Sequence, residues 1–237
     1  LVPGGDASTR DINNNGIVVG EMAVVIENPA LEDDRAFMWS YDSGTGTHET
    51  VNMNDLSDLW FDLDTGDVAE EGWIAVRAYG INDSNQVVGM AINGTFTRSF
   101  LYEPDETGGS FTLLPQPAGQ AEVLTFAPFI NEQGVVLGRY TLNETWYAYL
   151  WVASDPGVIH LLDDVGVNGV GYPKGLSDSH FVIISNGVGG YYTTDVYAYS
   201  TDAGVLTYGL KETYPDEYQY TAKDLNQNNE LVLDHRI

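Results

Sequence analysis

The sequence predicts an all-β protein, a β-propeller of four-stranded antiparallel blades. Three observations carry this prediction. A pattern of ten residues, with a polar tetrad between two aliphatic segments, recurs five times. Two further strand-like segments follow each of the first four copies. One complete unit takes roughly 45 residues, which is the size of a propeller blade. A two-sheet β-sandwich is the alternative, and the strict repetition argues against it.

Each copy of the pattern joins an aliphatic anchor, a polar tetrad and a run of β-branched residues. The copies are DINNNGIVVG (11–20), GINDSNQVVG (80–89), FINEQGVVLG (129–138), GLSDSHFVII (175–184) and DLNQNNELVL (224–233). Their anchors, Ile12, Ile81, Ile130, Leu176 and Leu225, are spaced by 69, 49, 46 and 49 residues. An aliphatic strand, a polar turn and a second aliphatic strand predict a β-hairpin in every copy.

The tetrads have the chemistry of a hairpin loop built on a type I turn. Their fourth residues are Gly16, Asn85, Gly134, His180 and Asn229, residue types that tolerate a positive φ. Such a loop needs a positive φ at this position. Their first residues are Asn13, Asn82, Asn131, Ser177 and Asn226, whose side chains can bond nearby backbone N–H groups.

A third and a fourth strand complete each of the first four units. The third strand places an aromatic residue after a small one, at 36–39, 99–102, 148–151 and 198–199. Turn residues and a short apolar strand follow, as at 111–114 and 158–162. We therefore expect a single repeat domain over 1–237, with units near 7–54, 75–115, 124–163, 171–210 and 219–237. The last unit holds only its hairpin, so we expect either a longer native chain or an irregular closure of the ring.

An acidic insertion at 55–72 lengthens the first spacing. Its apolar residues Leu56, Leu59, Trp60 and Leu63 have helical spacing, which predicts a short amphipathic helix. Such a helix either caps an edge of its own domain or docks a protein partner. The first role explains the pattern without a partner, and the second makes these four residues a candidate docking site.

The charge of the chain excludes several classes of partner. It carries 35 acidic and 9 basic residues, a formal net charge of −26. Such a surface repels nucleic acid and anionic membranes, and no apolar run is long enough for insertion into a bilayer. Cysteine is absent, which excludes disulfides and thiol chemistry. The acidity together with few lysines is typical of a secreted protein from a salty habitat.

The blocks DINNNGIVVG (11–20) and RAFMW (35–39) resemble the bacterial extracellular HAF repeat, which pairs an IN-x-x-G-x-V-V-G hairpin with a HAF-L-W strand. The resemblance covers nearly the whole chain and weakens in the fourth and fifth units. Arg35, Arg98, Tyr147 and Tyr197 replace the usual histidine of the third strand. The resemblance implies a secreted or surface-attached protein, and it implies no catalytic residues.

One loop has ligands suited to calcium. Asp11, Asn13 and Asn15, followed by Gly16, match the start of a calcium loop, so we treat them as a candidate metal site. An EF-hand loop needs a glutamate at its twelfth position, where this chain has Met22. The hairpin turn explains the same residues fully. We expect the turn to be their main role, with calcium as the possible cofactor.

No arrangement of residues predicts catalysis. Acidic pairs occur at 33–34, 70–71 and 163–164, as expected of a solvated acidic surface, and the four histidines lack metal-ligand spacing. We therefore expect a non-catalytic, extracellular or cell-surface propeller that acts as a structural or protein-interaction module. A protein partner or self-assembly is expected. A glycan-binding propeller, and a glycosidase or lyase on the same scaffold, are the alternatives.

Overall fold

The computed structural model describes the chain in segments. They are residues 6–23, 34–53, 73–93, 96–104, 109–117, 123–153, 155–162, 172–178, 181–188, 191–198, 219–225 and 231–236. These residues are β-strands and turns, without an α-helix. No helix in this part of the chain is long and apolar enough to cross a membrane. The predicted helix at 55–72, with Leu56, Leu59, Trp60 and Leu63, lies outside the described residues.

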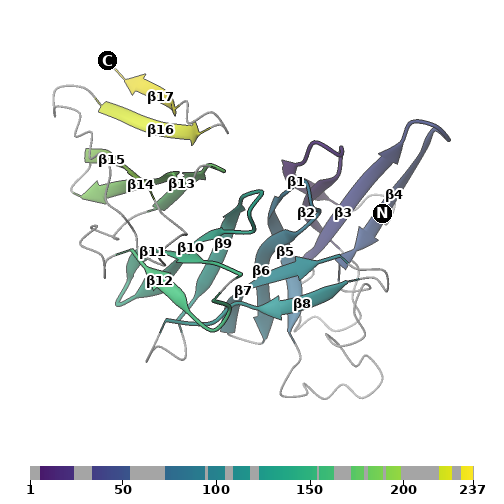
Figure 1. Cartoon of the computed structure of the whole chain (residues 1–237), viewed down its shortest axis with the longest axis horizontal. Helices are drawn as coiled ribbons and strands as arrows, with labels where there is room; N and C mark the ends of the chain where they lie inside the picture. The colour runs from purple at the N-terminus through teal and green to yellow at the C-terminus, as the bar shows by residue number, and fades with distance from the viewer. Residues whose placement is uncertain are drawn as a thin grey trace. The chain divides into compact units, whose positions relative to one another are not determined.

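The described segments contain seventeen strands, which follow the repeat order predicted from the sequence (Figure 1). The first eight are β1 (Ala7–Ile12), β2 (Val18–Ala23), β3 (Asp34–Asp42), β4 (Thr47–Asn52), β5 (Ile74–Ile81), β6 (Val87–Asn93), β7 (Phe96–Glu103) and β8 (Ser110–Leu113). The next four are β9 (Thr125–Ile130), β10 (Val136–Leu142), β11 (Thr145–Trp151) and β12 (Ile159–Leu161). The last five are β13 (Tyr172–Leu176), β14 (Phe181–Val188), β15 (Tyr191–Ala198), β16 (Gln219–Leu225) and β17 (Leu231–Arg236).

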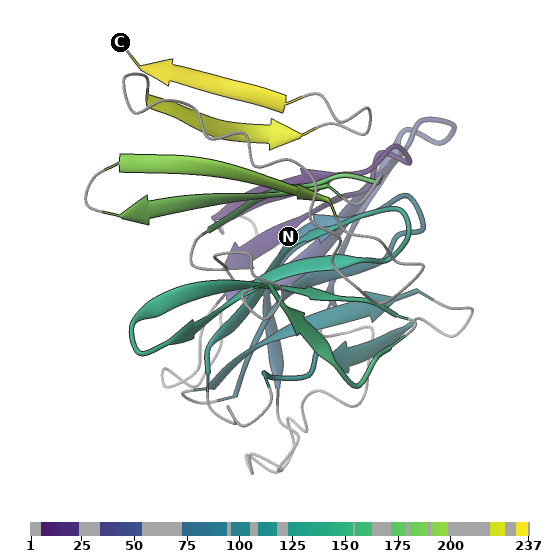
Figure 2. The same cartoon turned by 60° about the vertical axis from the view of Figure 1, so that its left-hand side comes forward.

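The strands form antiparallel sheets in which chain neighbours pair. Three sheets have four strands, in the orders β1-β2-β3-β4, β5-β6-β7-β8 and β12-β11-β10-β9. The fourth repeat gives the three-stranded sheet β13-β14-β15, and the fifth gives the hairpin β16-β17 seen clearly in Figure 2. The all-β prediction and its four-stranded meander are confirmed.

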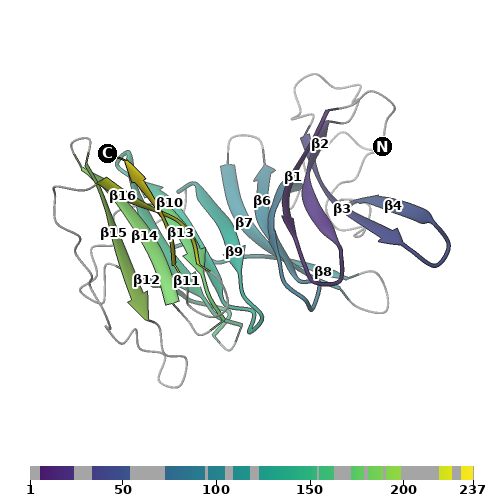
Figure 3. The same cartoon turned by 90° about the horizontal axis from the view of Figure 1, so that it is seen from above.

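Two compact units divide the chain. Leu1–Gln116 and Leu124–Ile130 make up the first, and Pro117–Val123 and Asn131–Ile237 make up the second. In the first unit, the sheet β5–β8 lies beside the sheet β1–β4 (Figure 3). Val87, Phe100 and Tyr102 of one sheet share a core with Ala36 of the other sheet and with Met53, which directly follows β4. The first two repeats therefore pack on each other through apolar sheet faces.

The opposite face of the β5–β8 sheet forms a second core. Ile74, Val76 and Met90 are buried there, and Phe126 of β9 packs against them. Alternation of side chains along a strand places these residues on one face and the residues of the first core on the other. The β5–β8 sheet is thus apolar on both faces, as expected for a stacked repeat.

Candidate functional site

The polar tetrads form tight loops with the predicted geometry. In the first hairpin the Gly16 N–H donates to the Asn13 carbonyl at 3.0 Å, and the Asn13 N–H donates to the Ile17 carbonyl at 3.1 Å. The second and third hairpins repeat both bonds. The fourth residues of these three tetrads have positive φ, at 76° for Gly16, 60° for Asn85 and 72° for Gly134. The prediction is confirmed there, whereas His180 and Asn229 lie outside the described residues.

The first residue of each described tetrad is a buried polar side chain. Asn13, Asn82, Asn131 and Ser177 are between 1% and 9% exposed. The Asn13 Oδ1 accepts from the N–H groups of Asn15 and Ile17, at 3.1 and 2.9 Å. The side-chain oxygen of Asn131 makes the same two bonds in its own loop. These bonds satisfy loop N–H groups that would be costly to bury unpaired.

The same asparagine also reaches the next repeat. The Asn13 Nδ2 donates to the Asn82 carbonyl at 2.9 Å and to Asn85 Oδ1 at 2.8 Å. In the second unit the Asn131 Nδ2 donates to the Ser177 carbonyl at 3.1 Å. In both cases the donor is the first residue of one tetrad, and the acceptor is the first residue of the following tetrad.

The second position of the tetrad repeats the link through a carboxylate. The Asn14 N–H donates to Asp83 Oδ1 at 2.8 Å, and the Glu132 N–H donates to Asp178 Oδ1 at 2.9 Å. A hydrogen bond to an ionised acceptor is stronger than one between neutral groups. We call this pair of links, through the first and second tetrad positions, the tetrad interlock. It joins successive repeats in each unit at the repeat spacing.

A cross-strand pair of a glycine and an aromatic residue recurs in each of the three four-stranded sheets. The closing glycine of the pattern lies opposite the aromatic residue of the third strand: Gly20 opposite Phe37, Gly89 opposite Phe100 and Gly138 opposite Tyr149. A Cβ on Gly20 would collide with the main-chain oxygen of Ser8, and one on Gly89 would collide with the main-chain oxygen of Arg77 and lie 2.7 Å from Phe100 Cε1. A Cβ on Gly138 would collide with the Tyr149 ring. Glycine is needed because the neighbouring main chain or the opposite aromatic ring occupies the space of a side chain.

The fourth repeat departs from this pair on both sides. Ile184 stands where the first three copies have glycine, and its cross-strand partner is Asp195. The fourth repeat therefore has no glycine–aromatic pair at this position.

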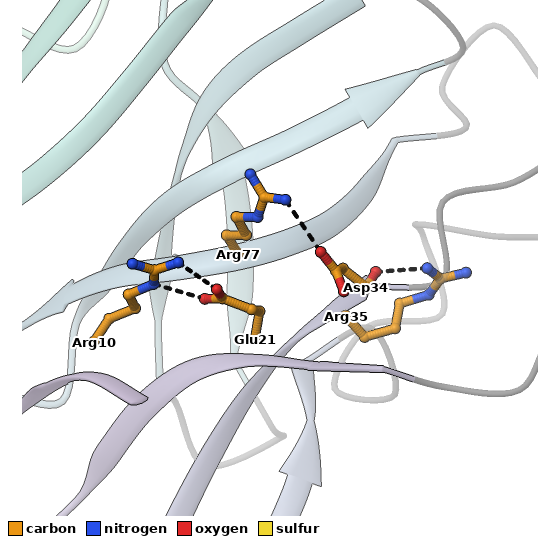
Figure 4. Close-up of polar contacts among 5 residues, drawn as sticks. All are labelled: Arg10, Glu21, Asp34, Arg35 and Arg77. Carbon is orange, nitrogen blue, oxygen red and sulfur yellow. Dashed lines mark hydrogen bonds and ion pairs between the residues drawn. The ribbon is translucent and has the colours of Figure 1, made fainter. Parts of the chain in front are cut away.

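An arginine–carboxylate cluster lies where the first two repeats meet (Figure 4). The guanidinium of Arg10 forms a bidentate ion pair with the Glu21 carboxylate, with Arg10 Nε 2.8 Å from Glu21 Oε2. Arg77 reaches Asp34 Oδ2 at 3.1 Å, and Arg35 donates to the Asp34 carbonyl at 2.6 Å. Three of the six arginines of a strongly acidic chain are thus gathered in one place.

The cluster consists of two ion pairs, Arg10–Glu21 and Arg77–Asp34. The hydrogen bond that Arg10 donates to the Glu21 carboxylate raises the pKa of Arg10 above its ordinary value, although partial burial opposes it. Burial also acts to lower the pKa of Arg77, but its bonds to Asp34 and Tyr79 outweigh that effect and raise it. Sequence reasoning missed this cluster. The sequence feature that could have indicated it is the position of three of the few arginines on strands of two successive repeats.

The candidate calcium ligands have other partners in this structure. Asp11 Oδ1 accepts from the Ile12 N–H, and Oδ2 accepts from the Ile81 N–H at 3.0 Å. The Asn15 Nδ2 donates to the Asp83 carbonyl at 2.7 Å. Asp11, Asn13 and Asn15 therefore each bond a residue of the second repeat, in addition to their place in the hairpin turn. Calcium binding at this loop stays a prediction.

Aromatic residues of the third strands differ in exposure. Trp39 stacks on Tyr41 with centroids 6.4 Å apart and planes 10° apart, and Tyr41 is 56% exposed. Tyr102 and Trp151, which stand in register with Trp39, are each 3% exposed. Packing accounts for two of these three aromatic residues.

Comparisons with known proteins add little to this geometry. No protein-family model matches the chain, and no curated protein matches it. The crystal structure of Porphyromonas gingivalis dipeptidyl peptidase 4 is similar over 92% of this chain, at 9% identity and a TM-score of 0.28. The chain spans 39% of the length of that protein. The described residues define the class as an all-β protein of four-stranded antiparallel sheets, and this similarity identifies neither a family nor an activity.

Proposed function

We propose that the chain is a β-propeller that acts, without catalysis, as a secreted or cell-surface module for structural support or protein interaction. The observation that carries the proposal is the tetrad interlock. The same side-chain positions bond successive repeats at separations of 69 and 46 residues. A link between equivalent positions of neighbouring units is typical of repeat folds, whose stability depends on each unit packing on the next.

The use of the polar groups supports a non-catalytic role. Asn13, Asp83 and the Arg77–Asp34 ion pair all bond one repeat to the next. Among the described residues, no group of three His, Asp or Glu side chains is placed to hold a metal ion. Tyr102 and Trp151 are buried, which favours packing over a lectin with one aromatic pocket per blade.

The net charge and the resemblance to the HAF repeat support a secreted or cell-surface location. A net charge of −26 keeps a protein soluble and repels polyanions. The HAF-like repeats are of a kind found in secreted and surface-attached bacterial proteins. A protein partner is therefore expected to be neutral or basic.

The secreted or cell-surface location is tested by immunodetection on intact source cells, before and after mild external proteolysis, with a cytoplasmic protein as the control. We expect a signal on intact cells or in the medium, and loss of the surface signal after proteolysis. A signal that appears only after lysis contradicts the proposal.

The absence of catalysis is tested on a panel of polysaccharides. Robust turnover that a single Asp or Glu substitution abolishes would contradict it.

A further inference from the structure

The first hairpin contains a pair of residues that can react with each other. Asn15 and Gly16 are the third and fourth residues of the first tetrad, and none of the other four tetrads places asparagine directly before glycine. In such a pair the main-chain nitrogen of glycine can attack the side-chain amide carbon of asparagine. Glycine favours this attack because it has no side chain to block it and permits many backbone conformations. The pair is therefore a candidate site of self-modification.

The modification is deamidation, and water is its only co-reactant. The Gly16 nitrogen bonds to Asn15 Cγ and gives up its proton, the bond from Cγ to Nδ2 breaks, and Nδ2 leaves with that proton as ammonia. Water then opens the resulting five-membered succinimide. Opening at one carbonyl gives aspartate, and opening at the other gives isoaspartate, in which the main chain runs through the former side chain.

The structure restrains both groups that take part in this reaction. The Gly16 N–H donates to the Asn13 carbonyl at 3.0 Å, within the hairpin. The Asn15 Nδ2 donates to the Asp83 carbonyl at 2.7 Å and to Asn85 Oδ1 at 3.1 Å, both in the second repeat. The attacking nitrogen is thus held by its own loop, and the leaving amide is held by the next repeat. Ring closure has to break these bonds, so it requires the first hairpin to open away from the second repeat.

The product opposes the contact that restrains the reaction. An aspartate at position 15 has no side-chain N–H, so it cannot donate to the Asp83 carbonyl or to Asn85 Oδ1. The new negative charge is also added next to Asp83, whose carboxylate accepts from the Asn14 N–H at 2.8 Å and from Asn14 Nδ2 at 2.7 Å. Neighbouring like charges repel each other. Deamidation therefore removes a donor and adds repulsion where the first two repeats meet.

We infer that Asn15 is a self-modification site whose deamidation uncouples the first repeat from the second, and that the bonds between these repeats control its rate. The change is irreversible because the ammonia is lost to the solvent, so the modified fraction records how often the first hairpin has opened. This inference goes beyond the proposed function, because it requires neither a partner nor a particular cellular location.

Peptide mapping by mass spectrometry tests the inference on the full chain. The native chain is incubated at mildly alkaline pH with and without urea, and aspartate and isoaspartate at position 15 are measured over time. Asp83→Ala and Asp178→Ala are incubated without urea. Asp83 and Asp178 each accept from the N–H of the second residue of the preceding tetrad, but Asp83 bonds the first hairpin and Asp178 bonds the third. Asp178→Ala is therefore the matched control.

We expect the native chain to convert at Asn15 more slowly than the same chain in urea. Asp83→Ala should convert about tenfold faster than the native chain, because the loss of a hydrogen bond to a charged acceptor makes local opening more frequent. Asp178→Ala should convert at the native rate, because the bond that it loses lies in another hairpin.

The effect of the product is measured by urea denaturation of Asn15→Asp, with Asn143→Asp as the control. Asn143 lies in the turn between β10 and β11 and has a positive φ of 49°, which aspartate tolerates, so the substitution adds the same charge in the second unit. We expect the urea midpoint of Asn15→Asp to fall and that of Asn143→Asp to stay near the native value.

Four results would overturn the inference. They are equal conversion of the native chain with and without urea, conversion in Asp83→Ala that is no faster than in Asp178→Ala, no conversion at Asn15 in either the native chain or Asp83→Ala, and a native urea midpoint in Asn15→Asp.

Discussion

The side-chain nitrogen of Asn13 lies 2.9 Å from the main-chain oxygen of Asn82, which is 69 residues further along the chain. Asn13 is 9% exposed, and its Oδ1 accepts two N–H groups of its own loop. One side chain therefore closes a hairpin and joins two repeats. The predictions below follow from this double role and from the packing around it.

Asn13→Ala should be strongly destabilising. The substitution leaves loop N–H groups and the Asn82 carbonyl without a partner, and we expect the free energy of unfolding to fall by about 3 kcal/mol. Asn13→Ser should lose less, because serine occupies the same position in the fourth repeat, at Ser177, and keeps a short acceptor. Urea denaturation measures both variants. Equal stability of Asn13→Ala and the native chain would contradict the role assigned to Asn13.

Gly16→Val should cost about 1–2 kcal/mol of folding free energy, because a β-branched residue resists the positive φ of 76°. Space is not the cause, since a Cβ on Gly16 meets no atom within 4 Å. Gly157→Val is the matched control. A Cβ on Gly157 also meets nothing within 4 Å, and Gly157 has no positive φ. The free energy of unfolding of Gly157→Val should therefore stay within about 0.5 kcal/mol of the native value. Similar losses in the two variants would refute the strain argument.

Gly89→Ala and Gly138→Ala should each lower the free energy of unfolding by about 1–3 kcal/mol, because the new Cβ has no free space. In Gly89→Ala the Cβ meets the main-chain oxygen of Arg77 and the Phe100 ring, and in Gly138→Ala it meets the Tyr149 ring. Thermal melts measure the loss, with Gly157→Ala as the control in open space. Neutral behaviour at both sites would show that the aromatic rings do not depend on glycine.

The pKa of the Asp42 carboxyl should lie below its ordinary value of 3.8, because the Thr45 hydroxyl and the Gly44 N–H donate to it. A lowered pKa contributes stability that is complete above pH 3.8 and is lost as the pH falls through the folded pKa. Thr45→Ala should raise the pKa toward 3.8, whereas Thr47→Ala should leave the Asp42 bonds in place. A carboxyl-carbon NMR titration measures all three proteins. An unchanged value in Thr45→Ala would contradict this assignment.

The sequence predicted the strand order and the loops because both depend on local patterns. Positive φ at Gly16, Asn85 and Gly134 follows from residue type within four residues of chain. Alternation and turn chemistry then define each hairpin. The closed ring and the single domain over 1–237 depend on how distant units are placed, and they stay predictions.

The interlock itself could not be predicted from a single repeat. Asn13 was expected to bond its own loop, and it does, but its Nδ2 also bonds the second repeat, which no local pattern specifies. The arginine cluster was missed for the same reason, since Arg77 and Asp34 are 43 residues apart and meet only after packing. The role of Asp83 as an acceptor for Asn14 likewise requires the stacked repeats.

The most direct test of the interlock is a double-mutant cycle between Asn13 and Asn85, whose side chains meet at 2.8 Å. Asn13→Ala and Asn85→Gly are measured alone and together by urea denaturation, glycine being chosen because it keeps the positive φ of 60°. A direct contact between repeats predicts a coupling energy of about 0.5–3 kcal/mol. Additive losses, with a coupling near zero, would contradict the claim that these hairpins bond one repeat to the next.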